Sequence, residues 1–180
     1  RLTIRTRGTD PRSAALLADA HALGLTQVAA IDVADLVLFD SDVPPAQQAA
    51  IEGVLVDPLL QTASWQAADD GIDTELLPGV TDPTAQAVAL ALATVGLPPM
   101  SIATGKHFAV TSTEGTPDEG TLVTLARTLL ANAVIERWAP APIAPSFVDR
   151  QATAESSVDH VAIVERIVDR FGTLQKIMRA

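Results

Sequence analysis

Few residues in this chain are of the types that do chemistry in enzyme active sites. The sequence has three histidines, His21, His107 and His160, and it has no cysteine. The histidines fall on different expected elements, and none has a metal-ligand spacing such as HExxH. Without cysteine there is no thiol nucleophile, no thiolate metal site and no disulfide. We therefore predict no catalytic, cofactor-binding or metal-binding residue.

Pairs of closely spaced aspartates are the residues that would suit a hard metal ion. The pairs are Asp32 and Asp35, Asp40 and Asp42, and Asp69 and Asp70. We place each pair at a strand end or a turn, where aspartate commonly accepts a hydrogen bond from its own backbone. The pattern therefore favours solvated turns over a metal site.

Lys106 and His107 are adjacent polar residues on an expected strand, residues 100–110. Neighbouring side chains of a strand point to opposite faces, so the two cannot face one pocket. The sequence has no GxGxxG and no GxxxxGK[ST] phosphate loop, and Gly105 followed by Lys106 is only a dipeptide. We expect structural roles for both residues.

The charge balance excludes one class of partner. The chain has 22 acidic and 12 basic residues and a formal net charge of −10. Such a surface repels phosphate backbones, so we expect no nucleic-acid binding. No apolar run reaches membrane-spanning length and no signal segment opens the chain, so we expect no membrane partner. Together with the absence of cysteine, this favours a cytoplasmic protein.

Residues 74–138 predict the order strand, helix, strand, helix, strand. Asp82 can cap the free amides of the first helix, and Pro83 suits its first position. The TPDE segment, residues 116–119, is typical of a capping box that opens the next helix. Leu125, Leu129 and Leu130 continue that helix.

The end of this second helix carries two further predictions. We expect Leu129 and one of Val134 or Ile135 to be buried between helix and sheet. Asn132 is expected to cap the helix, because asparagine tolerates the left-handed conformation that ends many helices.

Residues 1–66 repeat the pattern of residues 72–139. The segment TDP occurs at residues 9–11 and 81–83, and LGL at residues 23–25 matches VGL at 95–97 with the same offset. We expect strands over residues 2–7, 28–39 and 60–65 and helices over residues 10–23 and 44–55. Arg1, Arg5 and Arg7 alternate along the first strand, which indicates a solvated sheet face.

The sequence therefore predicts an α+β fold, a tandem pair of small βαβαβ-type two-layer sandwiches followed by a C-terminal helix. The units are residues 1–66 and 72–139. Each three-stranded sheet alone leaves open edges that a second copy can cover. Prolines make residues 140–157 a tether. Apolar residues at helical spacing predict an amphipathic helix over residues 158–180.

Three segments resemble the PurS-type small subunit of phosphoribosylformylglycinamidine synthase: LPGVTDPTAQAVALAL, GKHFAV and ARTLLANAVIERW. The resemblance covers residues 74–138 well and residues 1–65 loosely. It implies a PurS-like fold, and because larger forms of the synthase carry a covalent tandem of such units, it implies a tandem here. The first unit departs from the pattern, because Ala34 and Asp35 lie where the second has Gly105 and Lys106.

By this resemblance, the chain is expected to be a non-catalytic structural and assembly domain of an ATP-dependent, glutamine-using ligase of purine biosynthesis. The implied partners are the ligase and glutaminase components of the synthase and further copies of the chain. The essential cysteine of the glutaminase is not in this sequence. Two alternatives remain open: a metabolite-sensing tandem α/β regulatory module, and a self-associating interaction domain that uses the terminal helix.

Overall fold

The structure is a computed structural model that describes residues 1–68 and 70–147 of the chain. Its elements follow the order strand, helix, strand, helix, strand twice. They are β1 (Leu2–Thr6), α1 (Pro11–Ala22), β2 (Val28–Phe39), α2 (Pro45–Leu55), β3 (Gln61–Ser64), β4 (Ile72–Leu76), α3 (Pro83–Thr94), β5 (Ile102–Ser112), α4 (Glu119–Leu125), the π-helical segment η1 (Ala126–Leu130) and β6 (Glu136–Pro140).

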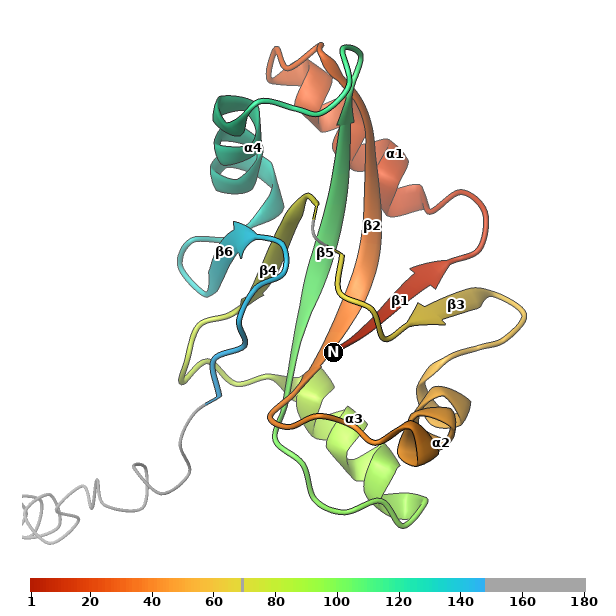
Figure 1. Cartoon of the computed structure of the whole chain (residues 1–180). Helices are drawn as coiled ribbons and strands as arrows, with labels where there is room; N and C mark the ends of the chain where they lie inside the picture. The colour runs from red at the N-terminus through yellow and green to blue at the C-terminus, as the bar shows by residue number, and fades with distance from the viewer. Residues whose placement is uncertain (69, 148–180) are drawn as a thin grey trace, which may run out of the picture. The chain divides into compact units, whose positions relative to one another are not determined.

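The six strands of the described residues form one antiparallel sheet (Figure 1). The strand order is β3-β1-β2-β5-β4-β6, so β3 and β6 are the edges. The long strands β2 and β5 pair at the centre, from Val28 beside Ser112 to Phe39 beside Ile102. The β2–β5 ladder joins the strands of residues 1–66 to those of residues 72–140.

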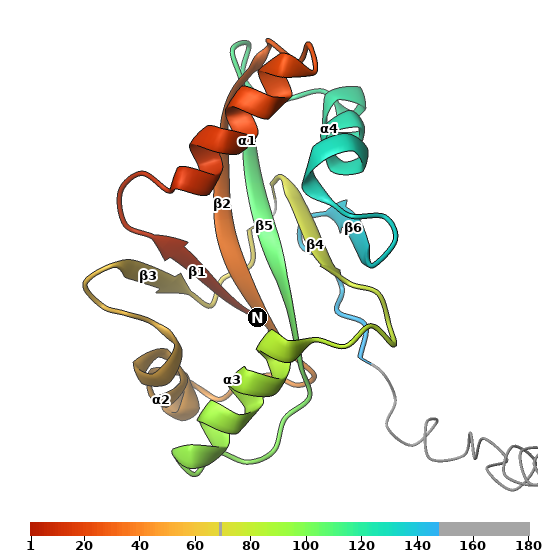
Figure 2. The ribbon, with the colours of Figure 1, turned by 180° about the vertical axis from the view of Figure 1, so that it is seen from behind.

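The helices lie on one face of this sheet, as Figures 1 and 2 show from opposite sides. Side chains alternate along β2, so Ile31, Val33 and Val37 point to this helix face. Leu36 and Leu38 point to the other face, which we call the open face. The alternation is that of a two-layer α+β fold.

Two apolar clusters lie between the helices and the sheet. The first contains Ala20 of α1 together with Leu125 and Leu130 of α4 and η1. The second contains Ile51 of α2 and Leu92 of α3. Each cluster therefore draws helices from both halves of the chain. The prediction gave each half its own sandwich. In the structure the two halves instead share one sheet and both apolar clusters.

The predicted helix starts at Asp10 and Asp82 agree with the structure. The side chain of Asp10 accepts from the backbone N–H of Arg12, and that of Asp82 from Ala85, both at 2.8 Å. The predicted capping box at residues 116–119 is wrong, since the cap of α4 is Asp118, which accepts from the N–H of Thr121 at 2.9 Å.

The second half of the α4–η1 helix differs from the prediction because it is π-helical. Its wider turn places Leu125 and Leu130, five residues apart, in the first cluster, and leaves Leu129 partly buried. Val134 and Ile135 are exposed, so the prediction that one of them is buried is wrong.

Asn132 does not have the predicted left-handed conformation, since every residue with positive φ in the described part of the chain is glycine. The helix ends at Ala131 in extended conformation. Asn132 instead begins the turn that leads into β6.

The chain after β6 packs on the open face. Ile143 is buried there beside Leu36 and Leu38, and Phe147 packs against the same cluster. The first part of the predicted tether thus covers the sheet. The rest of that tether and the predicted helix, residues 158–180, lie outside the described residues.

Candidate functional site

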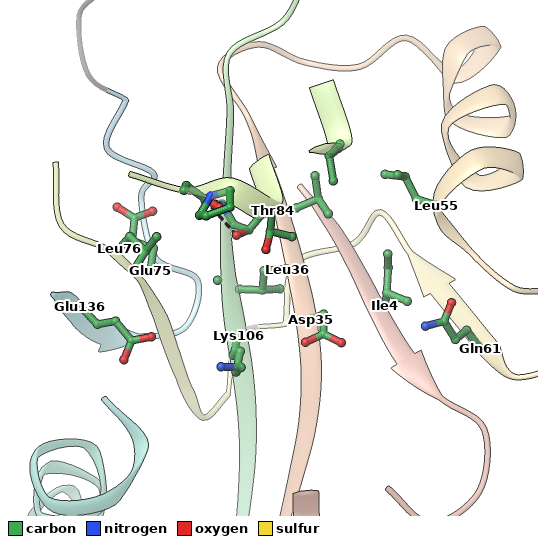
Figure 3. A pocket seen from close by; sticks show the side chains of 16 residues that line it. Ile4, Asp35, Leu36, Leu55, Gln61, Glu75, Leu76, Thr84, Lys106 and Glu136 are labelled. Atoms are coloured by element: carbon green, nitrogen blue, oxygen red, sulfur yellow. Dashed lines mark hydrogen bonds between the residues drawn. The ribbon is translucent and has the colours of Figure 1, made fainter. Parts of the chain in front are cut away.

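A pocket of about 430 Å³ lies on the helix face between the two apolar clusters (Figure 3). Its apolar end is lined by Ile4, Leu55 and Val88, and its charged end by Asp35, Lys106 and Glu136. These side chains come from both halves of the chain. The pocket has the size of many small-molecule sites.

Asp35 and Lys106 are directly opposite each other in the β2–β5 pair at the floor of this pocket. Arg12 of α1 holds Asp35 with two hydrogen bonds, Nη1 to Oδ1 at 2.7 Å and Nη2 to Oδ2 at 3.1 Å. Such a bidentate pair of hydrogen bonds holds the carboxylate in one orientation. Within residues 1–68 and 70–147, the side chain of Lys106 has no hydrogen bond or ion pair.

Arg12 also binds Asp10, with Nη2 2.8 Å from Oδ2. The hydrogen bond from Arg12 is the main reason why the pKa of Asp10 lies below its usual value. The two carboxylates in turn raise the pKa of Arg12. Arg12 therefore remains a cation that links α1 to Asp35 at the floor of the pocket.

Asp82 forms the opposite wall, where α3 begins. One oxygen caps α3, and the other accepts from the backbone N–H and the hydroxyl of Thr104, both at 2.9 Å. Both oxygens of this carboxylate are therefore occupied. Asp82 fixes the start of α3 against β5.

The open face carries a buried polar network around Asp73 of β4. Oδ1 of Asp73 lies 2.7 Å from Nδ1 of His107, and Oδ2 accepts from Arg1 at 2.7 Å and from the N–H of Ile143 at 2.9 Å. Burial alone would raise the pKa of Asp73, but these hydrogen bonds hold it below its usual value. The network attaches the chain after β6 to the sheet.

Glu75, two residues further along β4, is buried in the same way. Its Oε1 accepts from Arg137 and from the N–H and hydroxyl of Ser146, at 3.0 and 2.6 Å for the serine. Nε2 of His107 and Oε2 of Glu75 are buried without a hydrogen-bond partner among the described residues.

Sequence reasoning missed this network. Arg1 was expected on a solvated face, but it is largely buried against Asp73. Asp73 and Glu75 alternate with Ile72 and Thr74, which predicts solvent exposure. The signal that could have corrected this is Ile143, an apolar residue in the proline-rich segment that covers them.

The other predicted candidates are not brought together. His21 is exposed, and its Nε2 donates to the carbonyl oxygen of Val28 at 2.8 Å. Asp32 and Asp35 lie inside β2, not at a turn, and point to opposite faces. Asp69 and His160 lie outside the described residues. In the part of the chain that the structure describes, no group of three or more acidic or histidine residues could hold a metal ion.

Lys106 and His107 face opposite sides of the sheet, as strand alternation predicts. Lys106 is exposed in the pocket, and His107 is fully buried on the open face. Gly105 has a steric role, because a Cβ there would collide with the carbonyl oxygen of Thr74 on β4. The Gly-Lys dipeptide thus permits close strand packing and supplies a cation.

A turn over residues 57–61 leads into β3. The N–H groups of Leu60 and Gln61 donate to the carbonyl oxygen of Asp57 at 3.2 and 2.8 Å. The Asp57 side chain accepts from the N–H of Leu59 at 2.8 Å, and Oε1 of Gln61 accepts from the N–H of Asp57 at 2.9 Å. These four hydrogen bonds close the turn on itself.

The turn over residues 132–136, which leads into β6, has the same four bonds. The N–H groups of Ile135 and Glu136 donate to the carbonyl oxygen of Asn132 at 3.0 and 2.7 Å. The Asn132 side chain accepts from Val134 at 3.1 Å, and Oε2 of Glu136 accepts from the N–H of Asn132 at 2.7 Å.

Both turns expose two adjacent aliphatic side chains beside an edge strand. The exposed fractions are 83% for Leu59, 64% for Leu60, 81% for Val134 and 40% for Ile135. Each pair is a small exposed apolar surface beside an edge strand.

The described residues thus form an α+β domain with a six-stranded antiparallel sheet, consistent with a PurS-like fold. Residues 71–140 match the PurS family, described as phosphoribosylformylglycinamidine (FGAM) synthase, so the chain contains a PurS-like region. This match links the chain to purine biosynthesis and implies contact with other subunits of that synthase. No curated protein matches the chain. Among the described residues, no helix is long and apolar enough to cross a membrane.

Proposed function

We propose that this chain is a non-catalytic structural and assembly domain of phosphoribosylformylglycinamidine synthase. The observation that carries the proposal is the PurS match over residues 71–140. The sequence also has no cysteine, the residue that a glutaminase of this type needs as its nucleophile. The domain acts in the cytoplasm as part of the ligase assembly.

The domain is a tandem of two PurS-like units that share one sheet. Support comes from the strand order, in which β3-β1-β2 on one side corresponds to β6-β4-β5 on the other. The hydrogen bonds of the turns before β3 and β6 also correspond. So do the ends of α1 and α3, where Gly24 and Gly96 both have positive φ and close the helix in the same way.

The turns at residues 57–61 and 132–136 are the contact sites for the ligase and glutaminase components. Each turn holds its aliphatic pair in a fixed orientation, so docking costs little conformational entropy. The two turns stand beside opposite edges of the sheet, which lets one domain hold two components.

The experiment is co-purification of the chain with the ligase and glutaminase components of the synthase. We expect a stable complex, and we expect the double substitutions L59S/L60S and V134S/I135S each to weaken it by about tenfold or more. The matched control is L90S on α3, which also removes an exposed leucine but lies outside both turns.

Absence of any complex would contradict the assembly role. A complex that both double variants form as well as the unaltered chain would leave the assembly role standing but would exclude the turns as its contact sites.

A further inference from the structure

In the pocket on the helix face, the side chain of Lys106 has no bonded partner among the described residues. Lys106 stands on the central strand β5 with Glu136 on one side and Asp35 on the other, as Figure 3 shows. An ammonium group has three N–H donors, and within residues 1–68 and 70–147 none of those of Lys106 is bonded to protein. A bound molecule can therefore supply the acceptors.

The carboxylates around Lys106 are already bonded to other groups, but each oxygen of Asp35 takes only one hydrogen bond from Arg12 and keeps a second lone pair. Asp35 is held by Arg12, both oxygens of Asp82 are bonded, and Oε2 of Glu136 accepts from a backbone N–H. They still place negative charge around the cation. A dianion such as phosphate is repelled there, whereas a ligand with one carboxylate and one ammonium group matches both signs.

The far end of the pocket is mainly aliphatic. Figure 3 shows Ile4 of β1 and Leu55 of α2 beyond Asp35, with Gln61 beside Ile4. Val88 of α3 also lines the pocket. Burial of an aliphatic group against such a wall is favourable, because it removes apolar surface from water. A ligand that spans both ends therefore carries its charges at one end and an aliphatic group at the other.

We propose that this pocket binds a free amino acid with an aliphatic side chain. The ligand carboxylate binds Nζ of Lys106, its ammonium group donates to Asp35, and its side chain packs on Ile4 and Leu55. Arg12 is a positioning residue, because its two bonds keep Asp35 in place. The site draws on both halves of the chain, and the proposal does not rest on the assembly role.

The test is isothermal titration calorimetry of the full chain with leucine as the probe. Acetate tests the carboxylate alone, and isoamylamine tests the ammonium group with an aliphatic chain. Inorganic phosphate tests whether the pocket binds a dianion instead. We expect leucine to bind more tightly than any of these three, and more tightly than glycine, which lacks the side chain.

Substitutions then locate the site. Lys106→Met should weaken leucine binding by about tenfold or more, since it removes the partner of the carboxylate, while Lys106→Arg should retain most of it. Arg127→Met is the control, because it removes the same charge from an exposed position outside the pocket. Thermal melts check that each variant is folded.

Three results would overturn the proposal: no heat of binding with leucine, tighter binding of phosphate than of leucine, or leucine binding that Lys106→Met and Arg127→Met weaken equally. None of these results bears on complex formation with the synthase components, so the two proposals fail separately.

Discussion

The two faces of the sheet differ in how far their ionisable residues are exposed to water. On the helix face, Asp35 and Lys106 lie at a pocket and remain in contact with water. On the open face, Asp73 and His107 are fully buried. Lys106 and His107 are neighbours in sequence, so the difference arises from what covers each face. In this sheet an ionisable strand residue is part of the core where another segment of the chain covers it.

The largest expected effect is on the buried side of this comparison. Asp73→Asn leaves Arg1 and His107 buried without a carboxylate, so we expect the free energy of unfolding to fall by about 3–5 kcal/mol. Asp35→Asn loses a pair that is partly in water, and we expect about 1 kcal/mol or less. Urea denaturation measures both, and equal losses would contradict the distinction between the faces.

The acid dependence of stability tests the same network. Because the native pKa of Asp73 is lowered, its contribution is complete above the ordinary aspartate pKa of about 3.9. The contribution is lost as pH falls through the lower native value. The stability difference between the unaltered chain and Asp73→Asn should therefore be constant near neutral pH and shrink below about pH 4. A difference that grows on acidification would show that Asp73 is not ionised in the folded chain.

A smaller effect concerns the close approach of β4 and β5. Gly105→Ala places a methyl group against the Thr74 carbonyl, so we expect a loss of about 1–3 kcal/mol. Gly53→Ala is the matched control, since its Cβ would meet nothing within 4 Å on α2, and it should stabilise by about 0.5–1 kcal/mol. Thermal melts of both variants decide, and a neutral Gly105→Ala would mean that the two strands can separate without cost.

The smallest effect is expected for Lys106. Lys106→Ala removes a solvated side chain with no bonded partner in the described residues, so the free energy of unfolding should change by about 0.5 kcal/mol or less. A larger loss in urea denaturation would show that the cation stabilises the sheet, and it would weaken the comparison between the faces.

Local signals in the sequence predicted much of the fold. The residue pair Asp82 and Pro83 predicts the start of a helix because capping and the fixed φ of proline act within a few residues. The bounds predicted for β2, residues 28–39, agree with the structure for a similar reason, since the β-branched and apolar run ends at polar residues. Strand alternation also separated Lys106 from His107.

Features that depend on distant contacts were not predictable in this way. Asp73 and Glu75 have the pattern of solvent-facing residues, and only the packing of Ile143 and Ser146 buries them. The π-helical turn at the end of α4 has no local signature, so the prediction that Leu129 is buried holds only in part, and Leu130 is the residue in the core. The pairing of β2 with β5 was not predictable either, because the apolar pattern of a strand does not show which other strand lies beside it.

The β2–β5 ladder has a consequence for how the chain folds during synthesis. β2 is complete at Phe39, but its partner β5 begins only at Ile102, so the edge of β2 waits unpaired while the intervening residues leave the ribosome. Contacts of such long sequence separation slow folding, and an uncovered strand edge promotes aggregation. We therefore expect the nascent first half to be prone to aggregation until β5 is complete.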